Sequence, residues 1–170
     1  TEQTVSLNGF KLVKETSSGN QYTLLTFGQD TVPPRSYFLA AQEDGTFADQ
    51  ADTTYGTVLA DNNRIYLLDG QNTIVDTLAW GSISGASIAN PAKPESLQRT
   101  WREATMTWSP WTTAAFVSAA TSSQTLDSTQ IEEHEPEEEV IIPEPIRINE
   151  AGLWPVTGDV PWAEVYNPSS

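Results

Sequence analysis

The sequence contains no cysteine and a single histidine among its 170 residues. Without cysteine the chain has no disulfide bond and no thiolate nucleophile, and zinc or iron–sulfur sites that need cysteine ligands are excluded. The histidine, His134, lies between glutamates in a run of charge. The base of a Ser-His-Asp or Cys-His relay needs an ordered, partly buried setting instead. We therefore expect no such relay and no cofactor.

Basic residues are also few, because 8 Lys and Arg stand against 23 Asp and Glu, for a net charge of −15. A field of this sign repels phosphate backbones, so we expect no nucleic-acid partner. No apolar run approaches the length of a membrane span, and the start does not resemble a retained signal peptide. We expect no membrane span. If the protein is exported, its signal has been removed or lies outside this sequence.

Pairs of carboxylates are the remaining candidates for catalytic groups. Asp49 and Asp52 in "FADQADTTYG" are one such pair, and acid–base work on glycosides uses two carboxylates. Loop aspartates more often stabilise turns, and nothing in the sequence determines their separation. The acids of "EDGTFADQAD" also lack the spacing of a known calcium loop. We predict no catalytic residue and no metal ligand, and we interpret the chain as a protein other than an enzyme.

Short apolar segments separated by turn residues fill the first 80 residues. The clearest hairpin is "RIYLLDGQNTIVDTLAWG", in which two apolar runs flank residues that tolerate positive φ. No stretch before residue 95 keeps a helical period, so the spacing predicts an all-β sandwich or barrel. We interpret "PESLQRTWREATMTW" as mostly irregular, ending in an edge strand around "TAAFVSA".

The chain divides into a body (residues 1–120), a linker (121–145) and a C-terminal segment (146–170). The linker has eight acids and no Lys or Arg between Asp127 and Pro145. Like charges repel and proline stiffens, so we predict an extended spacer. The C-terminal segment contains two alternating stretches, "PIRINEAGLW" and "WAEVYNPSS". Two strands alone are not stable in water, so they must pair with another part of a protein.

Several of these stretches together resemble the lamin tail domain, an immunoglobulin-like β-sandwich. "INEAGLWPVTGDVPWAEVYNPSS" is similar to the opening two strands of that family, and "VSLNGFKL" is similar to its next strand. "PPRSYFLAAQ", "LADNNRIYLLDGQNTIVDTLAWG" and "ESLQR" followed by Trp resemble later segments of the domain. The order differs from the family, because the two opening strands come last here. Joining Ser170 to Thr1 would restore the family order.

The resemblance implies that the body is a sandwich without its first two strands. Such a body exposes a groove of unpaired backbone and apolar surface that must be filled. We expect the C-terminal segment to fill it alongside the first β-segment. The predicted donor residues are Ile146, Ile148, Leu153, Trp154, Trp162, Val165 and Tyr166. The predicted acceptor groove comprises Val5, Leu7, Phe10 and Leu12.

Three arrangements fit this expectation. The chain can fold back on itself as a circular permutant, donate the segment to the next copy, or be one period of a tandem polypeptide. Self-filling gains from a high effective concentration, whereas a stiff acidic linker disfavours folding back. We favour donation to a neighbour, which gives an open filament when the contacts do not close a ring.

The sequence therefore predicts a structural subunit of an extracellular or cell-surface filament in a prokaryote, with other copies of itself as partners. The alternative is a binding or anchoring module of a secreted surface protein, for a carbohydrate or protein ligand. Trp101, Trp108 and Trp111 would then form an aromatic platform. Against this stands the interpretation that these rings pack over the open end of the sandwich, because tryptophan is usually buried.

Overall fold

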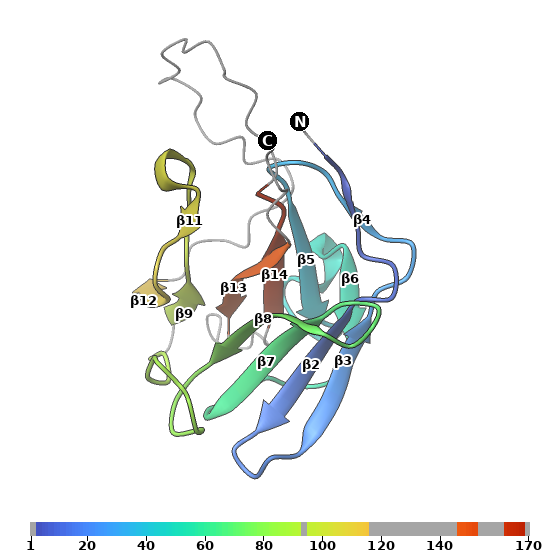
Figure 1. The fold of residues 1–170 in the computed structure, drawn as a ribbon. Coiled ribbons are helices and arrows are strands. Elements are labelled where there is room, and N and C mark those ends of the chain that lie inside the picture. The colour runs from blue at the N-terminus through green and yellow to red at the C-terminus, as the bar shows by residue number, and fades with distance from the viewer. Residues whose placement is uncertain (1–2, 93–94, 116–145, 153–161, 169–170) are drawn as a thin grey trace.

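Two β-sheets lie face to face in the computed structural model of the chain (Figure 1). The structure describes residues 3–92, 95–115, 146–152 and 162–168. The described residues include two short 3₁₀ turns and no α-helix, and neither turn is long and apolar enough to cross a membrane. The expected all-β sandwich is confirmed.

The four-stranded sheet follows the order β3-β2-β7-β8 and is antiparallel throughout. Its strands are β2 (Lys11–Thr16), β3 (Gln21–Thr26), β7 (Asn63–Leu68) and β8 (Ile74–Ala79). Along β7, buried residues alternate with half-buried ones, as expected for a strand with one face on the core. The predicted hairpin of β7 and β8 is confirmed, and Asn72 in its turn has a φ of 63°.

The six-stranded sheet follows the order β12-β9-β13-β14-β5-β6. Its strands are β5 (Tyr37–Gln42), β6 (Thr53–Tyr55), β9 (Glu95–Gln98), β12 (Thr112–Ala115), β13 (Arg147–Gly152) and β14 (Trp162–Tyr166). All neighbours are antiparallel except β5 and β6. The predicted edge strand near residue 115 is present as β12. The prediction that "PESLQRTWREATMTW" is mostly irregular is wrong at β9, which pairs with two strands.

Smaller elements complete the described chain. The strands β1 (Val5–Ser6) and β4 (Thr31–Val32) pair with each other, as do β10 (Trp101–Arg102) and β11 (Thr107–Trp108). Two short 3₁₀ turns, η1 (Ala48–Gln50) and η2 (Glu103–Thr105), lie in the connections.

One hydrophobic core lies between the two sheets. The four-stranded sheet contributes Leu12, Ile65, Leu67 and Leu78, and the six-stranded sheet contributes Phe38, Ala40, Leu97, Ile148, Ala163 and Val165. The core therefore draws on the body and on the C-terminal segment together.

Candidate functional site

The C-terminal strands β13 and β14 lie side by side in the middle of the six-stranded sheet (Figure 1). β14 pairs with β5 from Trp162, opposite Ala41, to Tyr166, opposite Tyr37. On the other side β13 pairs with β9, where Ala151 lies opposite Leu97. The body thus supplies a strand on each side of the pair. Without β13 and β14 the sheet would be divided into β12–β9 and β5–β6.

The inward faces of the inserted strands belong to the core. Ile148 and Val165 lie opposite each other and are 0% and 3% exposed. Ile146, just before β13, is buried as well, and the small Ala163 lies opposite Ala40 of β5. Burial of a large aliphatic side chain contributes about 1.5–3 kcal/mol. Insertion of the segment therefore supplies a substantial part of the stability of the sandwich.

The outward face of the pair carries aromatic side chains. Trp162 is fully buried, and its ring lies edge-on to Phe47 with 6.0 Å between centroids. A Cβ atom added at Gly152 would lie 2.2 Å from Trp162 Nε1, so only glycine leaves room for the indole. Tyr166 is also buried, with its ring centroid 4.6 Å from that of Tyr37. The side chains on this face are therefore buried, as those on the core side are.

Asn167 ties the end of β14 to the body. Its Nδ2 donates hydrogen bonds to the carbonyls of Gln3 and Val32, each at 2.9 Å. Its backbone N–H donates to Ser36 O at 3.1 Å, and its carbonyl accepts from Arg35 N–H at 2.9 Å. The side chain is fully buried. This residue therefore holds the two ends of the described chain together.

Arg99 fixes the start of β13. Its Nε donates to Ile148 O at 2.7 Å, and its Nη2 pairs with Asp76 Oδ2, which also accepts from Ile148 N–H at 2.8 Å. The guanidinium carbon lies 4.5 Å from the ring centroid of Trp108 and 4.6 Å from that of Trp111. Burial lowers the pKa of Arg99, an effect that the carboxylate of Asp76 opposes.

The structure brings most of the predicted donor residues together. Ile146, Ile148, Trp162, Val165 and Tyr166 are all buried at the insertion. Leu153 and Trp154 lie outside the described residues, as does the linker. The role of these residues as a subunit interface stays a prediction.

The prediction that the C-terminal strands lie alongside the first β-segment is wrong for the backbone pairing. They pair with β5 and β9 instead. Both edges of β2 are already occupied, by β3 and β7, and β1 is only two residues long and pairs with β4. The predicted groove residues Leu7 and Leu12 are buried in the same core cluster as Ile146, Ile148 and Val165, and Val5 and Phe10 pack against it. They share the core with the segment and do not pair with its backbone.

The three tryptophans do not form an exposed platform. Trp101 is 7% exposed, and its ring centroid lies 5.5 Å from that of Trp108. Trp108 also lies edge-on to Tyr166, with 5.7 Å between centroids. Trp108 and Trp111 are half-buried with Arg99 against their faces. These rings pack on one another, on Arg99 of the body and on Tyr166 of the inserted strand.

Two buried glutamates on the outward face were absent from the predicted site. Glu150 of β13 and Glu164 of β14 lie directly opposite each other and are 7% and 0% exposed. A β-bulge between Ile148 and Glu150 interrupts the register. The sequence contained one indication that Glu164 is buried. The alternation of "WAEVY" places Glu164 on the same face as two aromatic residues.

Among the described residues, neutral side chains donate hydrogen bonds to both carboxyl groups. Glu150 Oε1 accepts hydrogen bonds from Ser96 Oγ at 2.6 Å and from Gln98 Nε2 at 2.8 Å. Glu164 Oε1 accepts one from Asn149 Nδ2 at 2.6 Å. Burial raises the pKa of Glu150 to about 7, and the bonds from Ser96 and Gln98 oppose this shift.

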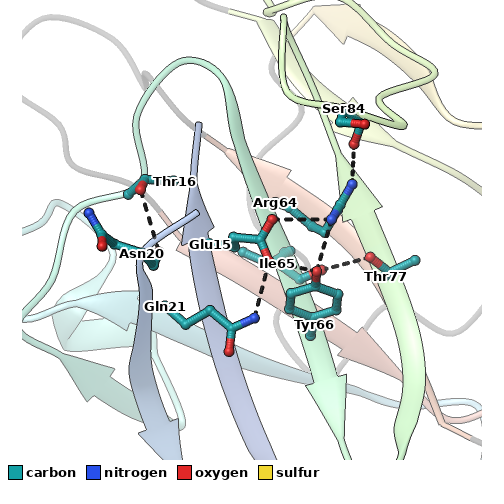
Figure 2. A network of polar contacts seen from close by, with 9 residues as sticks. All are labelled: Glu15, Thr16, Asn20, Gln21, Arg64, Ile65, Tyr66, Thr77 and Ser84. Atoms are coloured by element: carbon teal, nitrogen blue, oxygen red, sulfur yellow. Dashed lines mark hydrogen bonds and ion pairs between the residues drawn. The ribbon is translucent and has the colours of Figure 1, made fainter. Parts of the chain in front are cut away.

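The opposite surface of the sandwich carries a polar network and a groove. Glu15 of β2 accepts hydrogen bonds from Gln21 Nε2 at 3.1 Å, Tyr66 Oη at 2.8 Å and Arg64 Nη1 at 3.2 Å (Figure 2). The bonds from Gln21 and Tyr66, followed by the charge of Arg64, lower the pKa of Glu15.

The groove lies next to this network on the four-stranded sheet and has a volume of about 470 Å³. Its lining includes the apolar Val13, Leu68 and Ile74, together with Tyr66, Lys11 and Asn72. Lys11 Nζ donates a hydrogen bond to Asn72 Oδ1 at 2.7 Å.

Comparison with known proteins finds no family model, no curated protein and no solved structure that matches this chain. The resemblance to the lamin tail domain therefore stays a prediction from its motifs.

Proposed function

We propose that this chain is a structural subunit that assembles head to tail with other copies of itself. Each copy would donate β13 and β14 into the sheet of the next, and the assembly would form an extracellular filament or surface fibre of a prokaryote. One observation carries the proposal. The two central strands of the six-stranded sheet come from a segment that an acidic, proline-containing linker separates from the body.

Donation to a neighbour would reproduce the contacts seen within one chain. The pairings with β5 and β9, the Asn167 anchor and the Arg99 contacts join the segment to the body. Exchanging an identical element between copies preserves such contacts, so the balance between closure and exchange depends on the linker and the protein concentration. Residues 121–145 reach at most about 80 Å, and eight acids with prolines favour an extended chain.

Disulfide trapping can separate exchange from closure, because the chain has no cysteine of its own. Ala40 and Ala163 lie directly opposite each other on β5 and β14, a separation that a disulfide can bridge. Oxidation of the Ala40→Cys, Ala163→Cys double variant at high concentration should give a ladder of covalent multimers on a non-reducing gel. Refolding at high dilution before oxidation should give mainly a cross-linked monomer.

The two single-cysteine variants serve as controls, because neither can form more than a dimer. Light scattering and electron microscopy of the unmodified protein should show polymers at the concentration that produces the ladder. A cross-linked monomer as the sole product at every concentration, with no polymer in the unmodified protein, would contradict strand donation.

A second candidate function, a binding or anchoring module, is favoured by the groove on the four-stranded sheet. An aromatic ring, an apolar floor and a lysine in one concave surface are the features of a small-ligand site. A glycan array discriminates this function from a purely structural one, since only the binding module retains sugars.

A further inference from the structure

The inserted strands bring two carboxyl groups into the protein interior at one place. Glu150 and Glu164 are opposite partners on β13 and β14, and both are buried. Side chains at opposite positions of an antiparallel pair have Cβ atoms about 4.5–5.5 Å apart, and like charges there destabilise the pairing. Burial adds a further penalty for each ionised carboxyl. Docking with both groups charged is therefore unfavourable.

No Lys or Arg of the described residues forms an ion pair with Glu150. Its hydrogen bonds come from the neutral Ser96 and Gln98 of β9. Tyr37 of β5 and Tyr166 of β14 pack next to the pair, and burial, reinforced by Glu164, raises the pKa of Tyr37.

Two arginines of the described chain that flank the inserted strands bind other groups. Arg99 pairs with Asp76 of β8, and Arg147 of β13 donates a hydrogen bond to Val75 O.

We propose that docking of β13 and β14 takes up a proton onto the Glu150–Glu164 pair, so that mild acid tightens the insertion and alkaline conditions loosen it. This inference rests on the proposed function for its consequence, control of filament assembly by pH. The docking step itself is the same whether the strands come from the same chain or from a neighbour.

The pH dependence of docking follows from the number of protons that the docked and undocked states bind. In the undocked segment a solvated glutamate has a pKa of about 4.3, whereas the docked Glu150 has a pKa of about 7. The docked state therefore binds more protons between these two values, and the docking constant falls as pH rises through this window. Below this window the docking constant has its full value. Above the window the docking constant is lower by a factor on the order of a hundred.

Hydrogen exchange of the full-length chain tests this inference. Protection factors, corrected for the intrinsic exchange rate, are compared between about pH 5 and about pH 8. Peptides from β13 and β14 should lose at least tenfold in protection relative to β7, which serves as an internal reference. Glu150→Gln retains a hydrogen-bonding side chain without a charge and should abolish the loss. If that variant does not fold, NMR titration of the Glu150 carboxyl in the unmodified chain is the second measurement, and a midpoint near the solvated value of about 4.3 would overturn the inference.

His134→Asn is the control, because the single histidine also titrates in this window. This variant should keep the full pH response. Equal or greater protection at the higher pH in the unmodified chain would overturn the inference. So would a response that survives Glu150→Gln, or a recovery of protection on adding Ca²⁺, which would identify a cation as the neutralising partner.

Disulfide trapping of the Ala40→Cys, Ala163→Cys variant at the same protein concentration and the same pH values separates the two proposals. A pH-dependent loss of protection with cross-linked monomer alone supports the proton uptake and refutes the strand donation. A covalent ladder without the pH response supports the strand donation and refutes the proton uptake.

Discussion

Gly152 shows how a single position limits the insertion. The indole of the fully buried Trp162 occupies the space where a side chain would start, so a Cβ atom would lie 2.2 Å from Nε1. We predict that Gly152→Ala displaces the ring and destabilises the protein by about 1–3 kcal/mol. Urea unfolding followed by tryptophan fluorescence measures the change in the free energy of unfolding.

Gly28→Ala is the matched control, since a Cβ atom there would meet only Asp30 Oδ2, at 4.0 Å. Surface substitutions of this kind change stability by about 0.5 kcal/mol or less. Equal effects of the two alanines would show that Trp162 does not pack against Gly152 in solution.

At the scale of elements, Arg99 couples the inserted β13 to β8. The guanidinium of Arg99 contacts Asp76 and the Ile148 carbonyl and also lies against the rings of Trp108 and Trp111. A lysine retains the charge but lacks the planar group that makes these contacts together. We predict that Arg99→Lys lowers the free energy of unfolding by about 2 kcal/mol, the scale of a lost hydrogen bond to a charged group. Chemical denaturation at neutral pH gives this value.

Arg102 offers the comparison, because it is the exposed arginine of the adjacent β10. Arg102→Lys should leave the unfolding free energy within about 0.5 kcal/mol of the original. If Arg99→Lys were equally mild, the contacts of its guanidinium would contribute little to holding β13.

The elements also show where sequence patterns were informative. Turn residues and alternation predicted the β7–β8 hairpin, because its partners are adjacent in the chain and the turn determines their register. The same reasoning failed for β9, whose partner β13 lies about fifty residues later. The pairing of β14 with β5 was missed for the same reason, since alternation shows which face is apolar but not which strand edge is open.

For the whole molecule, the net charge of −15 opposes both folding and association of copies. Salt screens repulsion between exposed charges, with a screening length of about 8 Å at physiological ionic strength. We predict that raising NaCl from about 20 mM to about 500 mM raises the Tm by a few degrees. Differential scanning calorimetry at constant protein concentration provides the measurement.

A linker variant assigns this effect to its source. Replacing Glu137, Glu138 and Glu139 by Gln removes three of the acids and should reduce the rise in Tm with salt. A Tm that is constant or falls with NaCl in the unmodified chain would show that charge repulsion does not limit its stability.

The sequence by itself determined the β7–β8 hairpin, the division of β14 into a face with Trp162, Glu164 and Tyr166 and a face with Ala163 and Val165, and the exclusion of cysteine chemistry, because these depend on residue type and local periodicity. Only the tertiary structure decided that β13 and β14 enter between β9 and β5, and that Glu150 meets Glu164 in the interior. Backbone hydrogen bonds are alike for every strand, so the partner is selected by long-range packing of side chains. The burial that raises the pKa of Glu150 arises from that packing.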